Sequence, residues 1–290
     1  MPEPAGRRAP ATAAGPASPI AVDDDFLEPA RVVAAYELLR PWPRVPHGLF
    51  RCDLERVRRH RAGDDQSEEL AAYFGRELAG FLLDYFAALC AVLPAEQHGP
   101  GATLEFWIAS NCSVSEMVYP HLDTHSGDRL PGPERRPVLG TIFHLGPAGG
   151  QSQVGTFFSP GLPVPEAMLA HNRRPLPFDQ ALALADDWVE VPQRQNRLIR
   201  FDGRLPHFRS PVREVADPDA PRIALLANLW ERLPELDTRM RGVSLVTDGE
   251  FRVYRQLEQS EAEALRRLVG RFDDRELAAL VGVFRRLYRT

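Results

Sequence analysis

The chain has 290 residues, of which 44% are hydrophobic and 26% charged, and its formal net charge at pH 7 is -5. These fractions are typical of a folded globular protein, and no run of about 18 or more apolar residues is present to cross a membrane. Every basic residue is an arginine, which favours a bacterial source, and no basic stripe suggests a nucleic-acid partner. Because the N-terminus lacks the apolar stretch of a secretory signal, we expect a cytoplasmic protein.

The N-terminal part of the chain divides into a tail and a helical segment. Residues 1–22 are rich in Ala, Pro and Gly without hydrophobic periodicity, so we predict a disordered tail. Apolar residues then recur with helical spacing at 26–39 and again at 67–93. We therefore predict that residues 23–100 form a helical segment that packs on the core.

The middle of the chain carries short β-branched and aromatic runs that Gly and Pro turns separate. The runs are TLEFWIA, VLGTIFHL, VGTFFS, WVEVP, RLIRFD and RIALLANLW, between residues 103 and 230. This pattern predicts a many-stranded antiparallel sandwich or barrel over residues 101–235. A hairpin near SLVTDGEFRVYRQ and a return to helical spacing assign residues 236–290 to a C-terminal hairpin and helices.

A short polar stretch within this β region, YPHLDTH at 119–125, holds two of the eight histidines of the chain. Successive side chains of a strand alternate between its faces, so His121, Asp123 and His125 would point to one side of a β-strand. Such a set is either a metal site or a polar ladder on the surface.

A second histidine-containing strand can complete a metal site. Two imidazoles and one carboxylate on neighbouring strands form the facial triad of non-haem Fe(II) oxygenases, which leaves three coordination positions open. His121, Asp123 and His207 are one such set, since the interval before His207 is long enough for several strands to return the chain. The rival is a zinc site that uses Asp123 with His125 or with His144, because both spacings are compatible with strands.

The polar residues of the β region also come in a family-specific order. The order is His121-x-Asp123, a Gly149-Gly150 turn, His207 followed by Ser210-Pro211-Val212, and Arg222. In this order the sequence resembles the Fe(II)/2-oxoglutarate-dependent dioxygenases, nearest to their prolyl-hydroxylase and phytanoyl-hydroxylase-like branches. The resemblance spans about residues 103–230. It implies a mainly β fold with flanking helices: a double-stranded β-helix (jelly roll, cupin-like) buttressed by N- and C-terminal helices.

The resemblance also implies a role for individual residues. His121, Asp123 and His207 correspond to the catalytic Fe(II) ligands, and Arg222 to the residue that pairs with the distal carboxylate of 2-oxoglutarate. The chemistry agrees, because a guanidinium offers two parallel N–H donors to a carboxylate and stays charged when buried.

The arginine motif departs from the family pattern. Arg222 lies fifteen positions after His207, a longer interval than in many relatives, and Ala224 stands where some relatives have a serine that touches the same carboxylate. Arg200 or Arg209 are therefore alternatives to Arg222, and Thr141 on an earlier strand is a candidate for the missing hydroxyl.

Other residues are assigned to the substrate cavity or to the core by their position. Alternation along RIALLANLW puts Asn228 and Trp230 on the face of Arg222, so we expect both to line the cavity. Asn111 and Glu116 lie on the approach to the metal motif and are further candidates for substrate contact. The aromatic residues of the runs are predicted to be core: Phe106, Trp107, Phe143, Phe157 and Phe158.

The implied activity is oxygenation of a small molecule with 2-oxoglutarate and O2 as co-substrates. Asp123 favours oxygenation over halogenation, because halogenases of this class generally lack the carboxylate. The outcome is hydroxylation, desaturation or ring closure of a substrate such as an amino acid or a natural-product intermediate. Two alternatives are a cupin-like metal-binding protein without redox turnover, and a zinc-dependent hydrolase that uses His121, Asp123 and His125. The sequence carries no signal for the oligomeric state.

Overall fold

The computed structural model describes most of the β region and the helices that precede it. The described residues are 18–40, 49–54, 57, 70–71, 74–93, 102–111, 116–123, 136–146, 154–161, 164–171, 174–212, 220–231, 243–248 and 251–256. No helix within these ranges is both long and apolar enough to cross a membrane.

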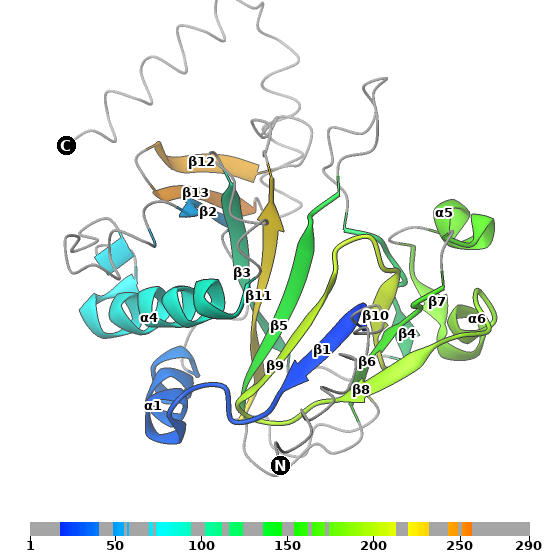
Figure 1. Cartoon of the computed structure of the whole chain (residues 1–290), viewed down its shortest axis with the longest axis horizontal. Coiled ribbons are helices and arrows are strands. Elements are labelled where there is room, and N and C mark those ends of the chain that lie inside the picture. The colour runs from blue at the N-terminus through cyan, green and yellow to red at the C-terminus, as the bar shows by residue number, and fades with distance from the viewer. Residues whose placement is uncertain are drawn as a thin grey trace, which may run out of the picture.

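A large antiparallel sheet forms one wall of the molecule (Figure 1). Its strand order is β1-β9-β5-β11-β3-β2-β13-β12. The bounds are β1 (Ile20–Asp23), β2 (Leu49–Asp53), β3 (Thr103–Asn111), β5 (Leu139–Gly146), β9 (Arg197–Asp202), β11 (Arg222–Trp230), β12 (Val243–Asp248) and β13 (Phe251–Gln256). The predicted C-terminal hairpin is thus confirmed as β12 and β13, and it extends this sheet through β2.

A small sheet faces the large one and completes a sandwich. It has the order β10-β6-β8, from β6 (Gly155–Phe158), β8 (Val189–Pro192) and β10 (His207–Arg209), and a separate pair joins β4 (Met117–Val118) to β7 (Leu176–Pro177). From β3 onward the chain crosses repeatedly between the two sheets, and a bridge between His121 and His207 attaches residue 121 to the outer side of β10. This alternation gives a jelly roll, so the predicted fold class is confirmed.

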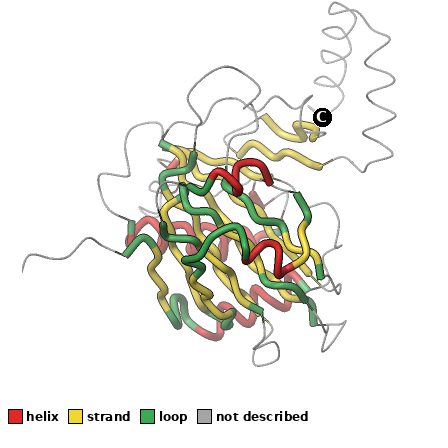
Figure 2. The backbone as a smooth tube through the Cα atoms, turned by 90° about the vertical axis from the view of Figure 1, so that its right-hand side faces the viewer, coloured by secondary structure: helices red, strands yellow, loops and turns green. Residues whose placement is uncertain are grey.

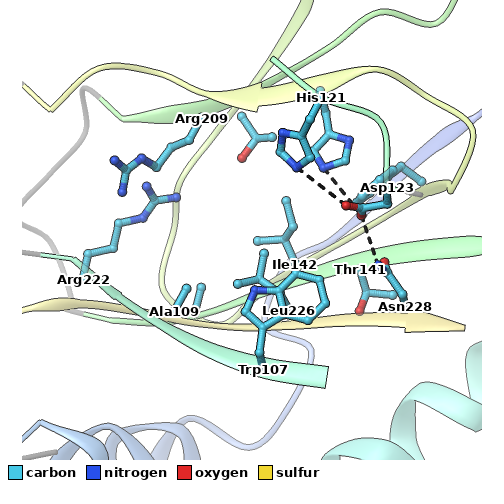
Figure 3. A pocket seen from close by; sticks show the side chains of 14 residues that line it. Trp107, Ala109, His121, Asp123, Thr141, Ile142, Arg209, Arg222, Leu226 and Asn228 are labelled. Carbon is cyan, nitrogen blue, oxygen red and sulfur yellow. Dashed lines mark hydrogen bonds and ion pairs between the residues drawn. The ribbon is translucent and has the colours of Figure 1, made fainter. Parts of the chain in front are cut away.

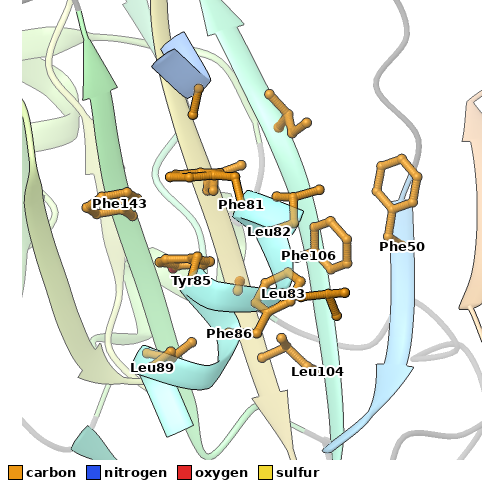
Figure 4. Packing of buried hydrophobic residues seen from close by; sticks show 14 of the residues in the cluster. Phe50, Phe81, Leu82, Leu83, Tyr85, Phe86, Leu89, Leu104, Phe106 and Phe143 are labelled. Atoms are coloured by element: carbon orange, nitrogen blue, oxygen red, sulfur yellow. The ribbon is translucent and has the colours of Figure 1, made fainter. Parts of the chain in front are cut away.

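Two helices cover the outer face of the large sheet: α1 (Pro29–Leu39) and α4 (Arg76–Val92). Figure 4 shows the α4 side chains Tyr85 and Phe86 packed against Phe106 of β3 and Phe143 of β5. The predicted helix 67–93 is interrupted at Gly75, whose φ of 78° is a left-handed value that glycine adopts without steric cost. This helix layer fixes the strands that border β11.

A further layer covers the outer face of the small sheet. Phe208 of β10 and Phe157 of β6 pack against α6 (Phe178–Leu182), which α5 (Glu166–His171) precedes. These two short helices lie at the right of Figure 1, on the side that faces the viewer in Figure 2. Because neighbouring residues of β10 alternate, Phe208 faces this layer while His207 and Arg209 face the space between the sheets. An apolar cluster that includes Ile142, Phe158 and Phe201 fills part of that space.

Several boundaries predicted from the sequence need comment. Residues 20–22 were assigned to a disordered tail, but they form β1, which pairs with β9. The tail boundary was placed too late, since Ile20 and Val22 supply strand residues despite the Pro-rich stretch before them. Residues 1–17, the Gly149-Gly150 turn and the predicted C-terminal helices lie outside the described residues.

Candidate functional site

The space between the two sheets holds a pocket with a volume of about 220 Å³. Its lining comes from the large sheet, the small sheet and residues 121–123 (Figure 3). The volume lies below the roughly 300–1,000 Å³ of pockets for drug-sized ligands, so the pocket suits a small ligand. The lining residues are Trp107, Ala109, His121, Asp123, Thr141, Ile142, Thr156, Phe201, His207, Arg209, Arg222, Ala224, Leu226 and Asn228.

Three potential metal ligands converge at one end of this pocket. Nε2 of His121 lies 3.6 Å from Oδ1 of Asp123, and Nε2 of His207 lies 3.8 Å from Oδ2 of the same carboxylate. One ligand atom from each of the three residues lies within 4.8 Å of the other two. The side chain of His121 is 26% exposed, whereas Asp123 and His207 are 8% exposed, so the cluster is open to ligands on the His121 side.

Backbone carbonyl groups orient both imidazole rings so that Nε2 points toward Asp123. Nδ1 of His121 lies 2.7 Å from the carbonyl oxygen of Tyr119, and Nδ1 of His207 lies 3.0 Å from that of Leu205. A carbonyl oxygen can only accept, so each Nδ1 carries the hydrogen and donates it. Each Nε2 lies toward Asp123 and is the nitrogen that carries the lone pair in the neutral ring, the orientation that outer hydrogen bonds impose on metal-binding histidines.

Asn228 holds the carboxylate of this cluster. Nδ2 of Asn228 donates a hydrogen bond to Oδ2 of Asp123 at 3.2 Å. The prediction placed Asn228 in the substrate cavity, and the residue does line the pocket, but its side-chain amide is directed to the predicted metal ligand. This contact joins β11 of the large sheet to the segment that carries His121 and Asp123, and no local pattern in the sequence indicates it.

Residues 119–123 of the stretch YPHLDTH do not form the continuous strand that the alternation predicted. Only His121 makes a β-bridge there, in which its N–H and that of His207 each donate to the carbonyl of the other at 3.0 and 2.9 Å. Alternation still separates the side chains, because Leu122 is buried while its two neighbours face the pocket. His125 lies outside the described residues.

Two arginine side chains occupy the end of the pocket away from the imidazoles (Figure 3). Arg222 comes from β11 and is 6% exposed; Arg209 comes from β10. Burial lowers the pKa of Arg222 to about 9, and the positive charge of Arg209 adds to this effect. Arg222 therefore remains protonated at neutral pH. From the sequence, Arg209 was predicted only as a substitute for Arg222, whereas the structure brings both into one pocket.

The other two residues considered for this role are differently placed. Arg200 pairs with Asp23 at 2.9 Å and donates to the carbonyl of Val92, and it does not line the pocket. Thr141 donates its hydroxyl to the Ala227 carbonyl at 3.1 Å and lies 3.5 Å from the Tyr85 hydroxyl on the α4 side. Its register places it beside Ala227 rather than Arg222, which does not support a shared carboxylate.

The predicted substrate residues are only partly brought to the pocket. Trp230 is buried but does not line it, and Glu116 is exposed. Asn111 pairs with Arg222 across β3 and β11, and its side chain lies outside the described set. The prediction that Trp107 is a core residue is wrong, because this indole lines the pocket opposite Leu226. The pairing register of β3 with β11 would have identified Trp107 as a pocket residue.

His144 does not join the metal cluster. Its ring is completely buried, it does not line the pocket, and neither ring nitrogen has a hydrogen-bond partner within the described ranges. Burial, with the positive charges of Arg222 and Arg197, holds its pKa well below the usual 6.5. His144 is therefore neutral in the folded protein, and its geometry gives no support to a zinc site with Asp123.

The neutral state of His144 predicts an acid-sensitive stability. The unfolded chain protonates this residue below pH 6.5 and the folded chain does not, so the unfolded state binds more protons and stability falls as pH falls. We expect His144 to remove about 1.4 kcal/mol from the free energy of unfolding between pH 7.5 and 5.5. Urea denaturation of chelator-treated wild type and His144→Leu, at both pH values, measures the contribution of His144 to this change in unfolding free energy. An identical pH dependence in both proteins would contradict it.

No family model matches the chain, and no curated protein matches it. Among solved structures the chain is similar to apo HygX from Streptomyces hygroscopicus, at 14% identity over 73% of this chain and 82% of that one, with a TM-score of 0.46. It is also similar to a Pseudomonas putida prolyl-4-hydroxylase, at 17% identity over 75% and 90%, with a TM-score of 0.34.

A third similar structure is the non-haem α-ketoglutarate-dependent carbocyclase SnoK from nogalamycin biosynthesis. It is 15% identical over 81% of this chain and 92% of that one, with a TM-score of 0.42. All three likenesses are of fold, at 14–17% sequence identity.

Proposed function

We propose that the protein is an Fe(II)- and 2-oxoglutarate-dependent oxygenase that acts on a small molecule. The observation that carries the proposal is the division of one pocket into two ends. His121, Asp123 and His207 gather at one end, and the buried guanidinium of Arg222 lies at the other. Two neutral nitrogen donors and one carboxylate on one side of an ion suit non-haem Fe(II) and leave sites for ligands.

The residues would hold 2-oxoglutarate by its two ends. Arg222 supplies parallel N–H donors for the distal carboxylate, while the 2-oxo acid group faces the histidines. Asn228 keeps the Asp123 carboxylate in place through its hydrogen bond. The co-substrate would therefore lie along the floor of the pocket with its reactive end fixed beside the metal ligands.

The floor between the two ends is apolar. It is formed by side chains that exclude water, of which only the indole N–H of Trp107 can donate a hydrogen bond: Trp107, Ala109, Ile142, Ala224 and Leu226. Bound iron would supply the activation of O2 and the oxidation of 2-oxoglutarate, while the chain orients the ligands and keeps the pocket dry. The partial exposure of His121 leaves this side of the cluster accessible to the substrate.

The proposed substrate is a small molecule such as an amino acid or a natural-product intermediate, and the proposed outcome is hydroxylation, desaturation or ring closure. The small volume of the pocket supports a small ligand. A polypeptide that alone supports turnover of 2-oxoglutarate would refute this part of the proposal.

The test is an anaerobic titration of 2-oxoglutarate into Fe(II)-loaded protein, followed by its visible charge-transfer band. Zn(II)-loaded protein is the matched control, since zinc has no such band. After admission of O2, succinate is measured with a panel of amino acids and other small molecules. We expect the band with iron only, and succinate release that at least one member of the panel accelerates.

The absence of both signals from folded, iron-loaded protein would refute an oxygenase. A band without succinate under any condition would favour the cupin-like binding protein, and hydrolysis by the zinc form would favour the hydrolase.

A further inference from the structure

The end of the pocket away from the imidazoles contains two guanidinium groups that face each other. Arg222 enters from β11 of the large sheet and Arg209 from β10 of the small sheet, and Figure 3 shows their guanidinium groups turned toward one another. Two like charges held together away from bulk water repel each other, because the local dielectric constant is lower than that of water. An anion between them would reverse the sign of this interaction.

The described lining provides no acid to balance these charges. Asp123 is its one acidic side chain, and that carboxylate lies with the imidazoles and Asn228 at the opposite end. Nε and Nη1 of Arg222 are buried without a hydrogen-bond partner among the described residues. Buried polar groups in folded proteins are normally satisfied, so these donors indicate a ligand that accepts hydrogen bonds.

A hydroxyl group stands beside the two arginines. Thr156 of β6 is directly opposite Arg209 in the ladder between β10 and β6, and both line the pocket. Residues directly opposite each other in an antiparallel pair project to the same face, so the Thr156 side chain stands next to that of Arg209. Thr156 is thus the threonine placed near the arginines, the position that the sequence had assigned to Thr141.

We propose that Arg209, with the hydroxyl of Thr156 beside it, shares with Arg222 the anion that binds at this end of the pocket. Two guanidinium groups then hold one carboxylate, and the subsite of these three residues binds a dicarboxylate without a metal ion. The inference rests on the proposed function only for the identity of the ligand, 2-oxoglutarate. Arg209 then has a role of its own as a second anion-binding residue rather than a substitute for Arg222.

The subsite implies selection for ligands with a negative charge at the distal end. A 2-oxo acid that lacks the second carboxylate leaves two guanidinium groups facing each other without an acceptor. Such a ligand has to compensate the full cost of unsatisfied buried donors. Glutarate keeps both carboxylates but lacks the 2-oxo group that chelates a metal, so it reports on this end of the pocket alone.

The test measures glutarate and 2-oxoglutarate binding to chelator-treated protein by calorimetry and thermal shift. Arg209→Gln and Arg222→Gln remove one charge each, and Arg174→Gln is the matched control because Arg174 is an exposed arginine outside the pocket. We expect each pocket variant to weaken glutarate binding about 10- to 100-fold, the effect of losing a hydrogen bond between charged groups. The double variant should show no binding, and the control should bind as the wild type does.

A second readout separates ligand binding from a merely structural role. Without ligand, Arg209→Gln should melt at the same temperature as the wild type or higher, because the repulsion between the arginines is gone. A structural role for Arg209 would lower the melting temperature instead. Arg209→Lys keeps the charge but loses the planar fork, so its affinity for glutarate should lie between those of the wild type and the Gln variant.

Two results would overturn the inference and leave the oxygenase intact. One is glutarate affinity unchanged in Arg209→Gln but lost in Arg222→Gln, which assigns the anion to Arg222 alone. The other is binding of 2-oxoglutarate by the iron-loaded wild type with no glutarate binding in the metal-free form. Conversely, glutarate binding lost in Arg209→Gln would support the subsite even if the iron-loaded protein gave no charge-transfer band.

Discussion

Replacement of His207 by Ala is expected to abolish iron-dependent turnover. The substitution removes one of the three potential ligands whose donor atoms lie within 4.8 Å of one another. Loss of a residue that merely orients a metal ligand lowers affinity or activity about 10- to 100-fold, so loss of a ligand itself should exceed about 100-fold. The measurements are iron content after equilibration with limiting Fe(II), the 2-oxoglutarate band, and succinate formation.

The controls for this variant address folding and the choice of ligands. His171→Ala removes an imidazole from the end of α5, away from the pocket, and should retain full activity. The ring of His207 also lies 4.8 Å from that of Phe201, between centroids, so circular dichroism has to show that the variant is folded. Added imidazole should restore part of the activity by refilling the space with a nitrogen donor. Unchanged activity of His207→Ala would favour the zinc hydrolase with His121, Asp123 and His125.

Truncation of Phe86 is expected to have the largest effect on stability. Phe86 of α4 is completely buried, and its ring centroid lies 4.6 Å from that of Phe106 on β3 and 5.3 Å from that of Tyr85. Phe86→Ala leaves a cavity between α4 and the large sheet and should cost about 3–5 kcal/mol of unfolding free energy. This is a large part of the roughly 5–15 kcal/mol that stabilises a typical domain.

Denaturation in guanidinium chloride measures this loss of unfolding free energy. Two further variants serve as comparisons. Leu169→Ala truncates a side chain that is 46% exposed on α5 and should change stability by no more than about 0.5 kcal/mol. Phe86→Leu keeps most of the apolar volume and should fall between the two. If Phe86→Ala lowered the unfolding free energy no more than Leu169→Ala does, the result would contradict the packing of α4 on the large sheet.

The strands were readable from the sequence because each is a short β-branched or aromatic run between turn residues. The six runs from TLEFWIA to RIALLANLW coincide with β3, β5, β6, β8, β9 and β11. The structure also brings His121, Asp123 and His207 together, as the motif order led us to expect, and their role as iron ligands stays a prediction. Both successes depend on residue type and order along the chain, which a sequence displays directly.

The side-chain contacts of the pocket were less readable because the large sheet is covered on both faces. Every residue of β5 after Leu139 is buried, so the strand shows no alternation of apolar and polar residues that would reveal which face is inward. Thr141 was assigned to the 2-oxoglutarate carboxylate and Trp107 to the core for this reason. The hydrogen bond from Asn228 to Asp123 joins residues 105 positions apart, and only the register between strands brings them together.

β11 also sets the length of the pocket. Arg222 and Asn228 belong to the same strand, six residues and roughly 20 Å of backbone apart, and one serves the guanidinium end while the other serves the metal-ligand end. β3 and β5 pair with this strand on either side, so the interval cannot stretch or shorten. The strand therefore determines the length of ligand that can reach both ends of the pocket. A longer or shorter dicarboxylate could be accommodated only by a new side chain at one of its two ends, because no loop movement alters the spacing between them.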